Sequence, residues 1–167
     1  MELWDILDKH GNKTGKIVER GMELDQGEYR LLVDVWIVNE KKEFLISKRI
    51  PTKQPYPDKW NPVCGSVVAG EDSISAALRE TKEELGIAID IQNGRLIKRF
   101  TCWLNAIIDV WLFNQEVDIN DVVLQKEETD EAMWATSSLI KQIIEKDGFI
   151  SYDRIPYMNE LFQICGV

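Results

Sequence analysis

The sequence predicts an α+β fold, an α/β sandwich, and three observations support this class. Segments rich in β-branched and aromatic residues are spread along the chain of 167 residues, which is typical of strands. One amphipathic helix that runs to Leu85 is expected in the middle of the chain, and further helices only near the C-terminus. The length favours one domain over residues 1–167, large enough to bury a core.

The first twenty residues predict a β-hairpin that extends this domain. Leu3 to Leu7 and Lys16 to Arg20 form its expected strands, and a turn with glycine and asparagine joins them. His10, the only histidine, lies in that turn, where solvent exposure is commoner than ligation.

The middle of the chain predicts a buried strand, a partner strand and a fixed loop. Tyr29 to Val38 is almost continuously apolar, as expected for a strand buried on both faces, and residues 43–49 pair back with it. Residues 50–62 carry four of the five prolines, so we expect an ordered loop around Trp60.

The second half of the chain predicts further strands and two helices. Strands are expected at residues 95–104, 106–113 and 122–124, followed by a charged loop over residues 125–131. A helix is expected over residues 139–146, capped by Ser137 or Ser138 and ended by Gly148, with a last short helix within residues 156–165.

The stretch from Gly65 to Ile87 predicts a loop that leads into the central helix. Asp72 or Ser73 can cap this helix, and Gly86 is placed as the left-handed residue that ends it. Apolar and small residues at three- and four-residue spacing direct one face to the core: Ile74, Ala77, Leu78, Thr81 and Leu85.

Three carboxylates crowd another sector of the same helix. At about 100° per residue, Glu80, Glu83 and Glu84 fall within a sector roughly 100° wide, where they repel one another. Divalent cations would remove the repulsion, and such oxygen ligands suit magnesium or manganese. Arg79 stands four residues before Glu83, close enough to hold that carboxylate. A solvated acidic surface is the alternative explanation of the carboxylates alone.

Gly65 to Ile87 as a whole resembles the Nudix box over its full length. The pattern is glycine, five residues, glutamate, seven residues, Arg-Glu, an aliphatic position, any residue, Glu-Glu, any residue, glycine and an aliphatic residue. Thr81 departs mildly, because the pattern prefers a larger aliphatic side chain there. An accidental match is on the order of one in a hundred million per window. The resemblance implies the Nudix fold, a central mixed sheet between helices with a catalytic loop–helix–loop.

The resemblance also implies an activity and roles for the box residues. Nudix hydrolases cleave a nucleoside diphosphate linked to another group X, by attack of water on phosphorus with the help of metal ions. By position, the implied metal ligands are Glu80, Glu83 and Glu84, for Mg²⁺ or for Mn²⁺ as a substitute. Arg79 is their implied orienting partner, and Glu71 is a charge that braces the loop that begins at Gly65.

Residues outside the box complete the expected site. The residue before the box glycine, Cys64, is implied to offer its carbonyl oxygen to a metal. Glu128 stands six residues before Trp134, a spacing that implies a further metal ligand or a general base; a solvated charged loop is the equal alternative for Glu128 and its neighbour Glu127. The candidates for substrate binding are Trp60, Trp103 and Arg49.

Two alternative functions stay open. The segment from Trp60 to Gly65 and the N-terminal extension also resemble isopentenyl-diphosphate isomerase, which shares the fold and has an active-site cysteine in that segment. Its metal site is built largely from histidines, whereas this chain has His10 alone. The other alternative is a non-catalytic nucleotide-binding module on the same scaffold.

Charge and composition limit the partners. A formal net charge of −9 opposes binding to nucleic acid polymers and to acidic membranes. It does not oppose a small phosphorylated substrate such as a nucleotide, because bound divalent cations reverse the local field. The absence of a long apolar run, of a secretory signal and of paired cysteine motifs predicts a cytoplasmic protein. Among partners, a homodimer stays open.

Overall fold

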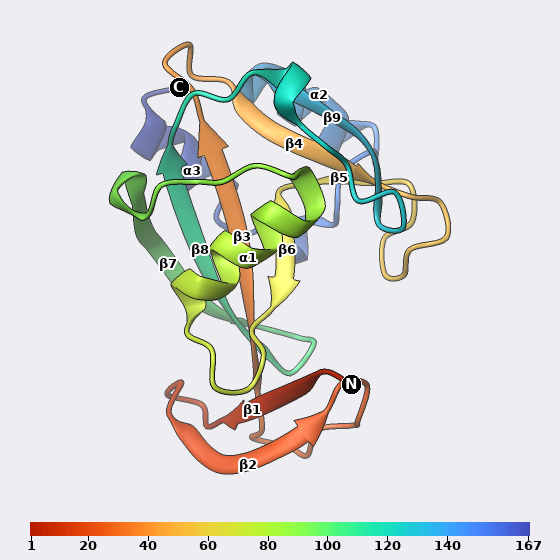
Figure 1. Ribbon diagram of the computed structural model, residues 1–167, viewed down its shortest axis with the longest axis vertical. Coiled ribbons are helices and arrows are strands. Elements are labelled where there is room, and N and C mark those ends of the chain that lie inside the picture. The colour runs from red at the N-terminus through yellow and green to blue at the C-terminus, as the bar shows by residue number, and fades with distance from the viewer.

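A seven-stranded mixed sheet lies between helices in the computed structural model, which describes residues 1–167 (Figure 1). The path of the sheet is β5-β4-β3-β8-β7, with β6 paired to β3 and β9 paired to β4. Only β3 and β8 run parallel. The expected α+β class and mixed sheet are therefore confirmed. The strands are β3 (Arg30–Val38), β4 (Phe44–Arg49), β5 (Trp60–Asn61), β6 (Val63–Ser66), β7 (Gly94–Cys102), β8 (Ala106–Asn114) and β9 (Thr129–Ala135).

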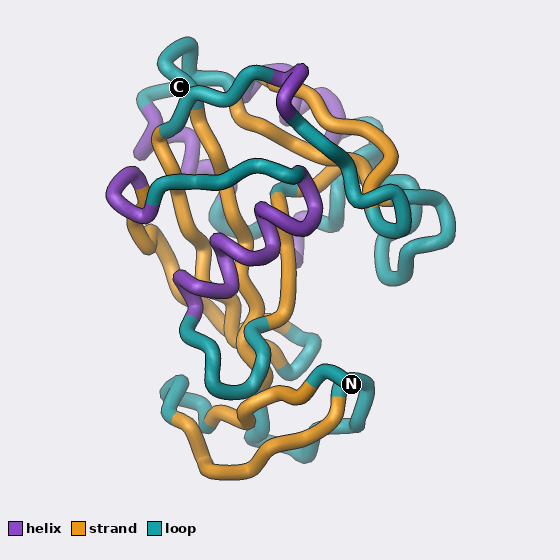
Figure 2. Tube along the Cα trace, in the orientation of Figure 1, coloured by secondary structure: helices purple, strands orange, loops and turns teal.

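The two faces of the sheet are covered by different helices, α1 (Ser73–Leu85) on one and α2 (Ser137–Glu145) and α3 (Met158–Cys165) on the other (Figure 2). Side chains of β3 alternate between the faces, as the pleat of a strand requires. Val33 and Val35 join the cluster under α1, whereas Leu32 and Trp36 join the cluster under α2 and α3. This confirms that the apolar strand is buried on both faces.

Helix α1 has the ends that the sequence predicts. The side chain of Asp72 accepts a hydrogen bond from the backbone N–H of Ser75 and so caps the N-terminus. Gly86 adopts a φ of 68° after the last turn, in the left-handed region that favours glycine. The helix is therefore fixed in register by local signals, which in turn fixes the direction of its glutamates.

The N-terminal hairpin, β1 (Leu3–Leu7) with β2 (Lys13–Glu19), forms a separate two-stranded sheet at one end of the molecule (Figure 1). It is attached to the loop before α1 by two hydrogen bonds of 2.8 Å, from the N–H of Ala69 to the carbonyl of Leu3 and from the N–H of Gly70 to the Asp5 carboxylate. The hairpin thus lies against the loop of the predicted site.

Several expected boundaries are wrong. Residues 122–124 form no strand; they follow the 3₁₀ turn Ile119–Asp121, and Val123 donates to the carbonyl of Leu85 at the end of α1. Strand β9 begins at Thr129 and so takes up the last three residues of the expected charged loop. Thr136 caps α2, and Asp147 rather than Gly148 takes the left-handed conformation after it. Short strand β5 interrupts the proline-rich loop, and the remaining 3₁₀ turns are Ile91–Asn93 and Tyr152–Arg154.

No helix of the structure has both the length and the apolarity that crossing a bilayer requires.

Candidate active site

The site begins where helix α1 crosses strand β6, at Gly65. A Cβ atom at Gly65 would lie 2.0 Å from Cδ of Glu80, so the glutamate side chain occupies the space that any other residue would fill. The box glycine is needed here for close approach, and not for an unusual backbone angle. This contact sets the carboxylate of Glu80 directly against the backbone of β6.

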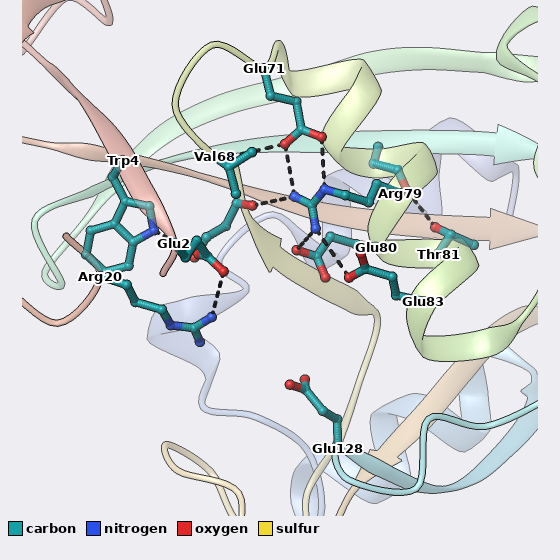
Figure 3. A network of polar contacts seen from close by, with 12 residues as sticks. Glu2, Trp4, Arg20, Val68, Glu71, Arg79, Glu80, Thr81, Glu83 and Glu128 are labelled. Atoms are coloured by element: carbon teal, nitrogen blue, oxygen red, sulfur yellow. Dashed lines mark hydrogen bonds and ion pairs between the residues drawn. The ribbon is translucent and has the colours of Figure 1, made fainter. Parts of the chain in front are cut away.

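Arg79 is the centre of an ion-pair network (Figure 3). Its Nε and Nη2 donate to the two oxygens of Glu71 at 2.9 Å each, and its Nη1 donates to Glu80 at 2.8 Å and to Glu83 at 3.3 Å. Nη2 also donates to the carbonyl of Ser66 at 2.9 Å. Hydrogen bonds to Glu71 first, and then to Glu80, raise the pKa of Arg79. The guanidinium therefore ties the helix to the loop on which Glu71 lies.

The three glutamates of α1 differ sharply in burial. Glu83 is half exposed, with 50% of its side chain accessible, whereas the side chain of Glu80 is 14% exposed and the residue Glu84 is 5% exposed. Burial raises the pKa of Glu80 to about 7 against the opposing effect of Arg79. Burial, together with the charges of Glu80 and Glu128, raises the pKa of Glu84 well above its usual value. Two carboxylates are thus held where their negative charge is costly.

The chemistry of these donors fits a hard divalent cation. Carboxylate oxygens in a desolvated, like-charged group gain most from such an ion, because it offsets both burial and repulsion. In this structure Glu80 and Glu83 are directed at Arg79, and no three acidic, histidine or cysteine side chains converge on a single point. The carboxylates are therefore suitable ligands for a divalent cation, and in this structure Arg79 binds two of them, Glu80 and Glu83.

A cleft of about 270 Å³ opens beside these carboxylates. Cys64 and Gly65 of β6 line it, as do Glu80 and Glu83 of α1. Glu128, from the loop before β9, lines the cleft from a different element, away from the Arg79 network (Figure 3). The Glu128 carboxylate forms an ion pair of 2.7 Å with Lys53 of the proline-rich loop.

Six cationic side chains line the same cleft, although the protein carries a net charge of −9. Four of them already form ion pairs: Arg20 with Glu2, Lys53 with Glu128, Arg79 with the box glutamates, and Arg154 with Asp34. The other two, Arg30 and Arg49, form none, and the Nε atom of Arg49 is buried without a hydrogen-bond partner. Unpaired guanidinium groups in a cleft are suited to anions such as phosphates.

The remaining sequence candidates lie in different surroundings. Trp60 packs on the core under α2 and α3, and Trp103 is 65% exposed in the turn between β7 and β8; neither lines the cleft. A role of these two tryptophans in substrate binding stays a prediction, and Tyr56 is the aromatic side chain that does line the cleft. The thiol of Cys64 donates to the carbonyl of Pro62 at 3.4 Å, and burial followed by the charge of Asp34 raises its pKa.

Sequence reasoning missed the buried pair under the cleft, Asp34 and Arg154. Nη1 and Nη2 of Arg154 donate to the two oxygens of Asp34 at 2.7 and 2.6 Å, and the hydroxyl of Tyr157 donates to Asp34 at 2.6 Å. A lone aspartate in a strand buried on both faces does signal a hidden partner, because a buried charge must be paired. Nothing in the sequence points to Arg154 as that partner, 120 positions later.

Comparisons with known proteins show relatives in sequence and in fold. The family model described as NUDIX domain matches residues 28–152. An uncharacterized Nudix hydrolase of Listeria monocytogenes is 37% identical over 165 residues, which cover 98% of this chain and 95% of that protein. An isopentenyl-diphosphate Delta-isomerase of Citrobacter koseri is 29% identical over 85 residues, 50% of this chain and 47% of the isomerase. The crystal structure of DR0079 from Deinococcus radiodurans shares the fold, with a TM-score of 0.79 at 19% identity, over 95% of this chain and 98% of that one.

Proposed function

The chain belongs to the Nudix hydrolase family, and on that premise we propose that it cleaves the diphosphate bond of a nucleoside diphosphate linked to a second group, with Mg²⁺, or Mn²⁺ as a substitute, as cofactor. The observation that carries the proposal is the meeting of two sets of charges in one cleft. Glu80 and Glu83 of α1 line one part of the cleft, and two cations without carboxylate partners, Arg30 and Arg49, line other parts of it. A metal-bound diphosphate requires carboxylates that hold the metal ion and cations that bind the phosphate oxygens.

The proposal assigns the cation to the glutamates of the box. Glu80, Glu83 and Glu84 would hold it, together with the carbonyl oxygen of Cys64. The bound cation supplies positive charge that polarises phosphorus and makes an attacking water more acidic.

The other residues position the substrate and move the proton. Arg49 has donors free for the oxygens of a diphosphate, and its buried Nε would gain a partner on binding. Glu128 takes the proton of the attacking water, and its ion pair with Lys53 fixes the direction of its carboxylate. Arg79 holds the helix and the loop together through Glu71, so that the glutamates keep one arrangement.

Glu84→Gln tests the proposal, because Glu84 is the most deeply buried carboxylate of the site. Released phosphate or nucleotide is measured with saturating Mg²⁺ on nucleoside triphosphates, nucleotide sugars, dinucleoside polyphosphates and non-nucleotide diphosphates. We expect kcat/KM to fall at least about 100-fold for any compound that the wild type cleaves. Glu145→Gln on α2, which removes the same charge outside the cleft, should stay at the wild-type rate. Near-normal turnover by Glu84→Gln would contradict the assignment, and tight binding without turnover by the wild type would favour a binding module.

Isomerisation of isopentenyl diphosphate is the second candidate, favoured by the position of Cys64 in the cleft and by the partial similarity to the isomerase. Two features oppose it: burial raises the pKa of the Cys64 thiol, which disfavours the thiolate, and His10 lies in the hairpin turn, outside the cleft. Cys64→Ala should therefore keep most of the diphosphatase activity. Complete loss in a folded variant, together with isotope exchange into isopentenyl diphosphate by the wild type, would favour the isomerase.

A further inference from the structure

Arg30 lies where the cleft meets the N-terminal hairpin. It is the first residue of β3, and its guanidinium carbon lies 4.6 Å from the ring centre of Trp4, a hydrogen-bonded side chain of β1 that is only 4% exposed. Stacking on tryptophan fixes the plane of the guanidinium, and it leaves the in-plane N–H groups free. Arg30 is therefore held in position by an aromatic ring and not by a carboxylate.

The nearby acid of the hairpin is already engaged (Figure 3). Glu2 accepts a hydrogen bond of 3.0 Å from Nε1 of Trp4 and forms an ion pair of 3.1 Å with Arg20. These two contacts use both oxygens of Glu2. The carboxylate of Glu2 is therefore paired with Arg20, and Arg30 has no carboxylate partner.

Arg30 also separates two cavities. The main cleft, which contains the box glutamates, and a second cavity of about 410 Å³ share only Arg30 and Leu104 as lining residues. The second cavity is walled mainly by Trp4 and by the segment of residues 21–24 that follows the hairpin. A substrate whose diphosphate lies beside α1 would therefore meet Arg30 at the end of the cleft that faces the hairpin.

The surroundings of Arg30 favour an anion. Burial first, and then the charge of Arg20, lower the pKa of Arg30, so the cation is held in an unfavourable environment. An anionic group between Arg30 and Arg20 would relieve both effects. Arg49 ends β4 and Lys53 lies on the loop after it, so both come from a different part of the chain, and Lys53 is paired with Glu128.

We propose that Arg30, stacked on Trp4, binds a second anionic group of the substrate, a phosphate or a carboxylate separate from the diphosphate that is cleaved. The hairpin and the segment after it are then a specificity element, and the substrate class is that of diphosphates with a further negative charge. This inference rests on the proposed function, because it places the cleaved diphosphate beside α1.

Matched substrate pairs test the inference. UDP-glucuronate and UDP-glucose differ by one carboxylate, and coenzyme A and dephospho-coenzyme A differ by one phosphate. The member of each pair with the extra carboxylate or phosphate is called the charged member. The readout is the ratio of kcat/KM for the charged member to that for the member without the extra group, with Mg²⁺. The wild type should prefer the charged member of at least one pair, and Arg30→Gln should reduce that ratio about 10- to 100-fold, since a hydrogen bond to a charged group is lost. Arg30→Lys should keep part of the preference, because it keeps the charge without the fork of donors.

Lys98→Gln is the control, since it removes one positive charge from an exposed pair with Glu160 outside the cleft and should leave the ratio unchanged. Calorimetric binding of the same four compounds to the metal-free protein gives a readout that does not need turnover. Hydrolysis by the wild type with an equal loss for both members in Arg30→Gln would overturn the subsite and leave the proposed function intact. Absence of hydrolysis, with charge-selective binding that Arg30→Gln removes, would overturn the function and leave the subsite intact. Equal binding of both members of each pair would overturn the subsite.

Discussion

At the scale of single residues, the charged side chains at the cleft fall into two groups, those that form an ion pair and those that do not. Glu71, Glu80 and Glu83 share Arg79, whereas Glu84 forms no ion pair although it is more buried than any of them. A carboxylate that is desolvated and unpaired is a costly feature, which proteins keep mainly where a ligand or a reaction uses it. The same argument applies to the cations Arg30 and Arg49. The unpaired charges of both signs therefore mark where substrate and cation are expected.

Glu80 predicts a pH dependence of stability in the absence of metal. Its folded pKa of about 7 lies above the ordinary value of 4.5, so the folded state binds more protons than the unfolded state between these values. The free energy of unfolding in EDTA should therefore fall as pH rises from about 4.5 to 7. Urea unfolding at pH 5 and pH 8 measures the change, and Glu80→Gln should reduce it. Saturating Mg²⁺ should raise stability more at pH 8 than at pH 5, since cation and proton compete for the same oxygens. If the free energy of unfolding of Glu80→Gln changes with pH as much as that of the wild type, Glu80 is not the titrating group.

Glu128 and its neighbour form a matched pair for testing the general base. Glu128 lines the cleft and pairs with Lys53, whereas Glu127 does not line the cleft. Since a positioned base contributes about 10²- to 10⁴-fold, Glu128→Gln should lower kcat by that factor with a smaller change in KM. Glu127→Gln removes the same charge from the same loop and should have little effect. Small and equal effects would mean that both belong to a solvated face, and a large effect at Glu127 alone would mean that the spacing to Trp134 identified the wrong glutamate.

At the scale of elements, the accuracy of sequence reasoning follows from how local the signals are. The start of helix α1 could be placed to within one residue, at Asp72 or Ser73, and its end at Gly86, because caps act through neighbouring backbone groups. Residues 122–124 could not, because a run of three apolar residues fits a strand and a packed loop equally well. What decides is the hydrogen bond from Val123 to the carbonyl of Leu85, a contact between separate segments. The cap of α2 moved by one residue because Thr136, Ser137 and Ser138 are all good caps.

The packing of α1 on β6 predicts a specific effect of Gly65→Ala. The new methyl group would displace Glu80, so metal binding should weaken and kcat/KM should fall about 100-fold, as expected when a reacting group is shifted by about an ångström. Gly94→Ala is a matched control, because its methyl group would lie 2.3 Å from a ring carbon of Phe113 on the sheet, outside the cleft. Both variants should be less stable, but only Gly65→Ala should lose activity per folded molecule. Specific activity and calorimetric Mn²⁺ binding measure the two effects. Equal specific activities and equal Mn²⁺ affinities of Gly65→Ala and Gly94→Ala would contradict a role for the contact between Gly65 and Glu80.

At the scale of the whole molecule, the cleft is assembled from segments that the sequence keeps far apart. Arg20 comes from the hairpin, Lys53 from the proline-rich loop, Glu80 from the box and Arg154 from the C-terminal region. The box could be recognised because its residues are close in sequence. Of the six cations only Arg49 and Arg79 could be named as site candidates, because the other four lie outside any motif and only the fold brings them to the cleft.

The pair of Arg154 and Asp34 carries the last prediction, because it joins the C-terminal region to the central strand beneath the cleft. The side chains of Arg154 and Asp34 are 6% and 0% exposed, and burial alone would lower the pKa of Arg154, whereas the charge of Asp34 raises it above its usual value. Arg154→Met would leave the carboxylate buried with only the hydroxyl of Tyr157 as a donor, and should cost about 3–5 kcal/mol in the free energy of unfolding.

Two further variants separate charge from packing. Lys98→Met breaks the exposed pair with Glu160 and should cost at most about 1 kcal/mol, since water screens such pairs. The double variant Asp34→Leu with Arg154→Met removes both buried charges, and it should recover much of the loss, because the cost of the single variant arises from the isolated carboxylate. Urea unfolding at neutral pH measures all three. If the double variant is as unstable as Arg154→Met alone, the arginine contributes through its packing under the cleft, and the ion pair is not what holds the C-terminal region to β3.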